Sequence, residues 1–310
     1  MKLSDFPRLR FGVREDFTLI GALRTILRYQ GHDIPYPSLM AMSGAAFRNA
    51  WVLNAYSASA ALAAPESILA KAVVKLGLQP TRIDLAVPDA GWAAIADMLM
   101  MGQAVLFWGG RRWRAAGILF GIETDPPALW ARTYTDPDDE GRRLPQAAWR
   151  QLASEGVEAW AFSVPHGLRR PDTYEILKLA SAISHADGDG SHQFGLSAYE
   201  SWAHTVEVQP PVAGSDAATL CIACVRTLLD ARRAAHTWLA GLPRPSPSSL
   251  LNAADCYEDY LYMLEELAMG FRHPEQAGGP GWLARRIRAA GQEDARAVSA
   301  IQATISIVAL

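Results

Sequence analysis

The sequence is poor in cysteine: only Cys221, Cys224 and Cys256 occur among its 310 residues. All three fall in strongly helical segments of the C-terminal half, which argues against a disulfide framework. Cys221 and Cys224 have the C-x-x-C spacing of a zinc-ligand pair, but apolar residues surround them and no second ligand pair follows. We therefore expect thiols that pack as small hydrophobic residues, with no metal and no cofactor.

Two further absences limit the classes of function. The formal net charge is only -3 and the paired arginines are scattered, so the concentrated basic face of a nucleic-acid-binding protein is missing. The N-terminus lacks the apolar core of a signal peptide, and no apolar run is long enough to cross a bilayer. These absences predict a soluble cytoplasmic protein whose partners include neither nucleic acid nor a membrane.

The chain does have enough length and apolar content for two ordinary cores, because half of its 310 residues are hydrophobic. Helical spacing over 66–77 and 89–101 predicts two helices, and four short apolar runs that follow them predict strands. The four runs are 103–110, 115–122, 128–134 and 158–164. Helices first and an antiparallel sheet afterwards is an α+β order.

The segment that follows residue 165 has a different pattern. Pro165–Pro171 is the predicted linker, and the elements beyond it have helical spacing. The predicted helices are 173–185, 195–206, 217–239, 250–271 and 283–308. We thus expect an α+β domain over 1–165 and an all-α helical bundle over 171–310. The apolar tail 301–310 needs cover from its own bundle or from a second copy, which favours a homodimer.

The most informative segment is Arg14-Glu15-Asp16-Phe17-Thr18-Leu19-Ile20-Gly21-Ala22-Leu23-Arg24. Asp16 is a good N-cap, helical spacing follows it, and Gly31 is a suitable stop. A second segment contains Ser43-Gly44-Ala45-Ala46-Phe47-Arg48. Together these segments resemble the papain-like family that contains butirosin biosynthesis protein H. That family is similar to the bacteriocin-processing peptidases that cut double-glycine leaders, and the resemblance extends to Phe194–Ala203.

The resemblance implies a papain-like, cysteine peptidase-like fold for the first domain and assigns its catalytic positions. The nucleophilic cysteine belongs on the first turn of the first helix, where Phe17 stands. The histidine begins the strand around Gly117–Gly121, where Ala115 stands, and the orienting aspartate remains as Asp136. Cysteine catalysis needs both a thiolate and an imidazole, so we expect a pseudoenzyme with no catalytic residue.

Three other side chains could replace the lost groups: Thr18, Ser43 and His32. No feature of the sequence brings a base to the hydroxyl of Thr18 or of Ser43. We therefore favour an ordinary helix residue for Thr18, a turn residue for Ser43 and a solvated loop histidine for His32. The glycine-rich stretch 187–192 has carboxylates and a histidine, but it lacks the closing glutamate of a calcium loop.

The residues around the positions assigned to the cysteine and the histidine still predict a ligand cleft between the two domains. Aromatic rings beside glycine suit a flat or extended ligand. The predicted cleft residues are Asp16, Phe17, Thr18, Trp108, Trp113, Arg114 and Asp136. The first hypothesis is a protein that binds a peptide, an acyl group or a small metabolite in a biosynthetic or peptide-modification pathway.

Two alternatives remain open. The resemblance to butirosin protein H implies transfer of a carrier-protein-borne acyl group to an amine, which positioning alone could still promote. A scaffolding partner of a biosynthetic complex is the other alternative. Turnover of a carrier-protein thioester would distinguish the acyltransferase from the scaffolding partner.

Overall fold

The computed structural model describes residues 1–9, 11, 15–57, 65–109, 115–136, 140–243 and 247–308. The chain is α+β and divides into two compact units. Unit 1 comprises Met1–Tyr36 and Val73–Arg170, and unit 2 comprises Pro37–Ala72 and Pro171–Leu310. The last division falls in the predicted linker, but residues 37–72, which the sequence placed in the first domain, group with the helical unit. The chain therefore enters unit 2 twice.

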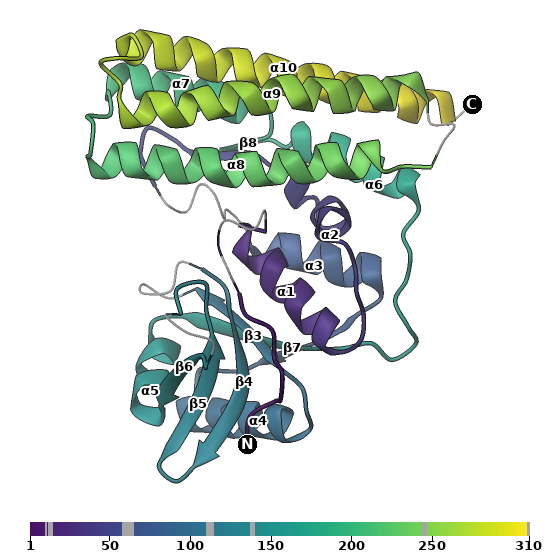
Figure 1. Cartoon of the computed structure of the whole chain (residues 1–310), viewed down its shortest axis with the longest axis vertical. Coiled ribbons are helices and arrows are strands. Elements are labelled where there is room, and N and C mark those ends of the chain that lie inside the picture. The colour runs from purple at the N-terminus through teal and green to yellow at the C-terminus, as the bar shows by residue number, and fades with distance from the viewer. Residues whose placement is uncertain are drawn as a thin grey trace. The chain divides into compact units, whose positions relative to one another are not determined.

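Unit 1 is built on a six-stranded antiparallel sheet with the order β2-β7-β3-β4-β5-β6 (Figure 1). Its strands are β2 Gln79–Ile83, β3 Val105–Gly109, β4 Gly117–Thr124, β5 Pro127–Arg132, β6 Arg142–Pro145 and β7 Val157–Ser163. The four apolar strands expected from the sequence are β3, β4, β5 and β7. The edge strands β2 and β6 were not predicted, because they are short, polar and largely exposed and so contain no apolar run.

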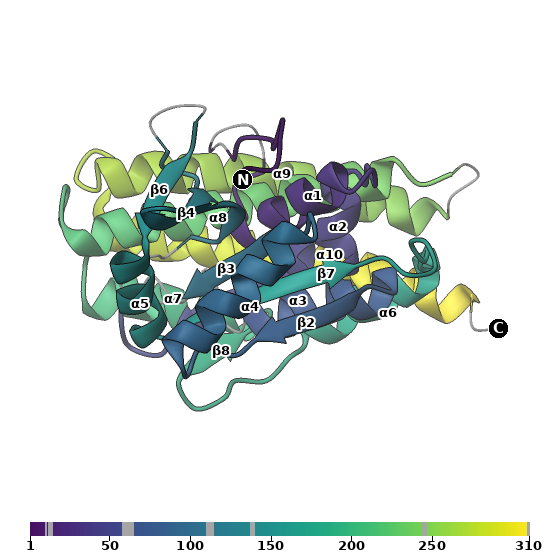
Figure 2. The same cartoon turned by 90° about the horizontal axis from the view of Figure 1, so that it is seen from below.

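Helices cover both faces of this sheet. They are α1 Thr18–Tyr29, α4 Pro88–Met100 and α5 Gln146–Ser154. α4 and α5 share one buried cluster with Val105 and Phe107 of β3, and α4 lies across the strands in Figure 2. The alternate residue Leu106 is fully buried as well and points to the opposite face. α1 contacts β3 and β4 and supplies the cover for that second face.

Unit 2 is a bundle of α6 Thr173–Ser184, α7 Ser197–Val208, α8 Asp216–Ala240, α9 Ser248–Arg272 and α10 Gly279–Val308. α9 packs against both α8 and α10, and α10 packs also against α6 and α7; the long helices run side by side in Figure 1. All five helices lie close to their predicted bounds. Residues 301–308 of the apolar tail continue α10, in which Ile301 and Thr304 are buried.

The structure differs from the predicted all-α bundle in one respect. β8 (His192–Phe194) pairs antiparallel with β1 (Ala50–Val52), a strand from the N-terminal half. The helix α2 Tyr36–Met42 and the 3-10 turn η1 Ala45–Phe47 precede β1, and the helix α3 Pro65–Leu76 follows it. The divisions between the units fall within α2 and within α3. Each paired strand has only three residues, so neither produces a periodic signal in the sequence.

The core of unit 2 is organised around stacked aromatic rings. Trp51 of β1 stacks on Trp202 of α7 with ring centroids 5.1 Å apart, and Trp202 stacks in turn on Phe271. Cys221 and Cys224 belong to the same cluster as free thiols, which confirms their prediction as packing residues. Throughout the part of the chain that the structure describes, no helix combines the length and the apolar character that crossing a membrane requires.

Candidate functional site

The candidate site in unit 1 lies at the first turn of α1. The helix begins at Thr18 with Phe17 as its N-cap residue, and no side chain caps it. The prediction of Asp16 as the N-cap is therefore wrong by one residue. The backbone N–H of Phe17 donates to Tyr36 Oη at 3.1 Å. The ring of Phe17 is only 2% exposed, so a packed phenyl group fills the position assigned to the nucleophile.

One hydrogen bond joins this turn to the start of β4. Thr18 Oγ1 accepts the backbone N–H of Ala116 at 3.1 Å in buried surroundings. Thr18 follows Phe17 and Ala116 follows Ala115, so the positions assigned to cysteine and histidine each adjoin one partner of this hydrogen bond. A phenyl ring and a methyl group can neither attack a carbonyl carbon nor transfer a proton.

The turn after β5 completes this corner of unit 1. Tyr134 Oη donates to the backbone carbonyl of Thr18 at 3.2 Å. Gly21 faces the same hydroxyl so closely that any Cβ there would collide with it, and glycine is therefore required at this point of α1. The Asp136 carboxylate accepts the Thr133 N–H at 2.8 Å and the Thr133 hydroxyl as well. Asp136 thus closes its own turn.

No imidazole is available to be oriented by Asp136. His32 and His166 are the only histidines in the sequence of unit 1. His32 follows the C-terminal end of α1, whereas Phe17 precedes its first turn, and His166 is exposed in the predicted linker. The carboxylate of a catalytic triad acts through the histidine that it holds, so Asp136 alone supplies no catalysis.

The remaining cleft residues are described only in part. Trp108 is the penultimate residue of β3, whose neighbours in the sheet are β7 and β4. Its ring is 7% exposed and stacks on the half-buried Trp160, with centroids 6.1 Å apart. Asp16 is half-buried, and Trp113 and Arg114 lie outside the described residues. Apart from Asp16, the described cleft residues are thus packed side chains of unit 1.

The alternative nucleophiles have structural partners. The Thr18 hydroxyl accepts the Ala116 N–H, as described above. Ser43 Oγ donates to the Met40 carbonyl at 3.0 Å and accepts the Ala45 N–H at 3.2 Å, so it closes a buried turn in unit 2. Among the described residues, no histidine contacts either hydroxyl. Neither side chain is activated as a nucleophile requires.

The two buried thiols of unit 2, Cys221 and Cys224, are equally unsuited to catalysis. Burial raises the pKa of Cys224 to about 12 and raises the pKa of Cys221 as well. A neutral thiol is a poor nucleophile and a poor metal ligand. Within the described ranges, no three histidine, cysteine or acidic side chains are grouped to hold a metal ion. The carboxylate of Glu200 forms an ion pair with Arg288.

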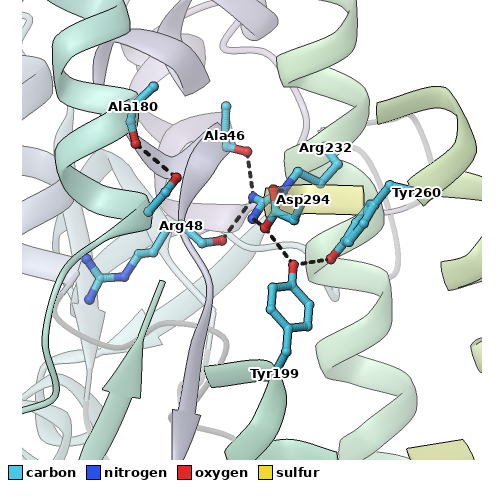
Figure 3. A network of polar contacts seen from close by, with 8 residues as sticks. Ala46, Arg48, Ala180, Tyr199, Arg232, Tyr260 and Asp294 are labelled. Carbon is cyan, nitrogen blue, oxygen red and sulfur yellow. Dashed lines mark hydrogen bonds and ion pairs between the residues drawn. The ribbon is translucent and has the colours of Figure 1, made fainter. Parts of the chain in front are cut away.

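Unit 2 contains a buried polar network (Figure 3). Arg232 of α8 donates to the Asp294 carboxylate of α10 at 3.1 and 2.6 Å, and its Nη1 donates to the carbonyls of Ala46 and Arg48 at 2.7 and 3.1 Å. Tyr199 Oη donates to Asp294 at 2.8 Å. Burial by itself lowers the pKa of Arg232, but Asp294 and the surrounding tyrosines raise it well above its usual range. Arg232 therefore stays charged, and its contacts join two helices to residues 37–72.

Sequence reasoning missed this network, although a signal was present. Arg232 lies on the apolar stripe of α8 between Leu228 and Ala235, and Asp294 lies on the apolar stripe of α10 between Ala290 and Val298. A charged residue at a core position indicates a buried partner. The helical spacing alone does not tell which residue that partner is.

Comparison with known proteins adds no relative. No protein-family model matches the chain, and no curated protein matches it.

Proposed function

We propose that unit 1 is a papain-like domain without catalysis and that the protein binds a peptide, an acyl group or a small metabolite. Its setting is a biosynthetic or peptide-modification pathway. The observation that carries the proposal is the hydrogen bond from the Ala116 N–H to Thr18 Oγ1. This bond supports the register in which Phe17 and Ala115 stand where a cysteine and a histidine would act.

The placement of α1 supports the same assignment. A papain-like site needs the first turn of a buried helix beside the start of a strand, because the helix N-terminus and the imidazole together lower the pKa of the thiol. α1 contacts β4, and its first turn is bonded to the residue before that strand. This placement supports the proposal of a papain-like site in which the inert side chains of Phe17 and Ala115 replace the reactive ones.

The chemistry of this corner favours binding over turnover. Members of a catalytic triad act as a unit, so loss of the nucleophile and the base removes most of the rate enhancement. The hydroxyl of Thr18, the nearest substitute, belongs to a residue that is 6% exposed, and it is occupied by the Ala116 N–H. Acyl transfer would depend on substrate positioning alone.

Binding and turnover can be measured on one preparation of the full chain. The probes are an N-acetylcysteamine thioester with an amine acceptor, and a synthetic double-glycine leader peptide. We expect saturable heat of binding for at least one probe and no product above the buffer rate. Product that scales with protein and is lost in Thr18→Val would contradict the pseudoenzyme and favour acyl transfer. Absence of binding by both probes would contradict the binding role.

The register has its own test. In the Phe17→Cys/Ala115→His variant the new imidazole should lower the pKa of the new thiol, measured from thiolate absorbance as the pH is raised. The reference is Phe17→Cys alone, and the matched control is Phe17→Cys/Thr81→His, whose histidine lies on the edge strand β2. Equal thiol pKa values in the two double variants would contradict the proposed register.

A further inference from the structure

One face of the small sheet in unit 2 carries charged and aromatic side chains that none of the preceding roles uses. Ala50 is opposite Phe194 and Val52 is opposite His192, so these residues share a face. The guanidinium carbon of Arg48 lies 5.0 Å from the centre of the Phe194 ring. The His192 ring is stacked with the Phe194 ring at a centroid distance of 5.8 Å.

The guanidinium of Arg48 forms no ion pair with any acidic side chain that the structure describes. Its side chain points away from Asp294, although its backbone carbonyl accepts a hydrogen bond from Arg232 (Figure 3). The Nε atom of Arg48 is buried without a hydrogen-bond partner, and in the described part of the chain no carboxylate forms an ion pair with this residue. Burial lowers the pKa of Arg48, and the charge of Asp189 opposes this effect. A desolvated cation with an unpaired N–H is costly unless something binds it.

Lys71 of α3 brings a second positive charge to this region. Its ammonium group donates to the carbonyl and the hydroxyl of Ser67 in its own helix. Burial lowers the pKa of Lys71, and repulsion by Arg48 lowers it further. The described residues place no acidic side chain in an ion pair with Lys71. Two partly desolvated cations are thus close enough to repel each other.

Asp189, the carboxylate whose charge acts on Arg48, is already occupied. It accepts the Ser191 N–H at 3.0 Å, the Ser191 hydroxyl at 2.8 Å and the His192 N–H at 2.8 Å. These hydrogen bonds, that of the Ser191 side chain above all, lower the pKa of Asp189. His192 Nδ1 lies 2.8 Å from Ser191 Oγ, whereas its Nε2 is buried without a partner. Asp189 therefore holds its own turn, and polar atoms of Arg48 and His192 are left unpaired.

We propose that this face of unit 2 binds the oxyanion of a small molecule, a phosphate or carboxylate group, through Arg48 and Lys71 beside the ring of Phe194. A guanidinium offers several N–H donors in a plane that matches such a group, and an ammonium adds a point charge. The Phe194 ring supplies a flat apolar surface for the rest of the molecule. The site lies wholly in unit 2, so it does not depend on the role of unit 1.

The test uses inorganic phosphate and acetate as probes of the full chain at constant ionic strength. A ligand that binds only the folded protein raises its thermal unfolding midpoint with concentration. We expect phosphate, acetate or both to raise the midpoint of the wild type. We expect Arg48→Gln and Lys71→Gln each to weaken the apparent affinity about tenfold, because each removes a charge-assisted hydrogen bond.

The matched control is Arg272→Gln, which changes an exposed arginine at the end of α9 and should leave the response unchanged. A response to phosphate alone would identify a phosphate site, and a response to acetate alone a carboxylate site. No response to either anion, or equal responses in Arg48→Gln and Arg272→Gln, would overturn the proposal. If Arg48→Gln does not fold, Lys71→Gln decides by the same criterion.

Discussion

Arg232 and Asp294 form a two-point ion pair whose side chains are 0% and 2% exposed. The pair joins α8 to α10, and the remaining guanidinium N–H groups reach the carbonyls of Ala46 and Arg48. Burial of two ions costs desolvation, and their pairing offsets it only while both partners are present. The pair therefore makes unit 2 sensitive to single substitutions at either end.

Arg232→Met should lower the free energy of unfolding by about 3–5 kcal/mol, because it leaves the Asp294 carboxylate buried and unpaired. Urea unfolding followed by circular dichroism measures this change. The neighbouring Arg233→Met is the matched control: Arg233 is 39% exposed and pairs with Glu265, so its loss should cost below about 1 kcal/mol. Equal costs for the two variants would contradict the network as described.

Thr18→Val should lower the free energy of unfolding by about 1–3 kcal/mol, because the buried Ala116 N–H loses its acceptor. Thr25 of the same helix serves as the control, since its hydroxyl only donates to the Gly21 carbonyl one turn earlier. Thr25→Val should stay within about 0.5 kcal/mol of the wild type. If Thr18→Val costs no more than Thr25→Val, the result would contradict the contact between Thr18 and Ala116, which supports the assignment of Phe17 and Ala115.

Trp51→Ala should destabilise unit 2 by about 3–5 kcal/mol, although Trp51 lies far from α7 in the sequence. The ring is 2% exposed, stacks on Trp202, and its Nε1 donates to Thr205 Oγ1 at 3.1 Å. The measurement is urea unfolding, with Trp51→Phe as the milder variant that retains an aromatic ring. A cost of Trp51→Ala below about 1 kcal/mol would show that residues 37–72 are no part of the core of unit 2.

Alkaline pH should reveal the buried thiols. The pKa of Cys224 is raised to about 12 in the folded chain, whereas an unfolded cysteine ionises near pH 8.5, at about its unperturbed pKa. The stability contributed by the neutral thiol is therefore complete below about pH 8.5 and is lost as the pH rises toward 12, by about 1.4 kcal/mol per pH unit.

The measurement for this thiol is urea unfolding at a series of pH values above neutrality. Cys224→Ala should show a shallower loss of stability than the wild type, since it removes one thiol that ionises on unfolding. Identical slopes in the two proteins would mean that Cys224 ionises as easily in the folded chain as in the unfolded one.

Much of the helical structure could be predicted because its signal is local. In α9, apolar residues such as Tyr257, Leu264 and Leu267 recur with helical spacing and are all buried, and the predicted span 250–271 is close to Ser248–Arg272. The edge strands β2 and β6 lacked such a signal. The helix start at Thr18 was misplaced by one residue because an N-cap aspartate is only a preference.

The residue types of the candidate site could be predicted from the sequence, but the contacts between them could not. The absence of cysteine from residues 1–170 excludes thiol catalysis by unit 1 whatever its fold. The link between Thr18 and Ala116 could be expected only through a resemblance, since nothing local connects residues so far apart in the chain. That the Asp136 carboxylate turns back to Thr133 depends on the backbone path after β5.

The places where most helices and apolar strands form could be read from the amino-acid order, because the spacing of apolar residues along a few turns decides which face each element can bury. It also determined which reactive groups unit 1 can have. The three-dimensional fold was needed to show that β1 pairs with β8, that Arg232 meets Asp294, and that Arg48 Nε is buried without a hydrogen-bond partner. Such pairings join residues far apart in the chain, and they follow from how the whole chain satisfies its buried polar groups, which no local pattern records.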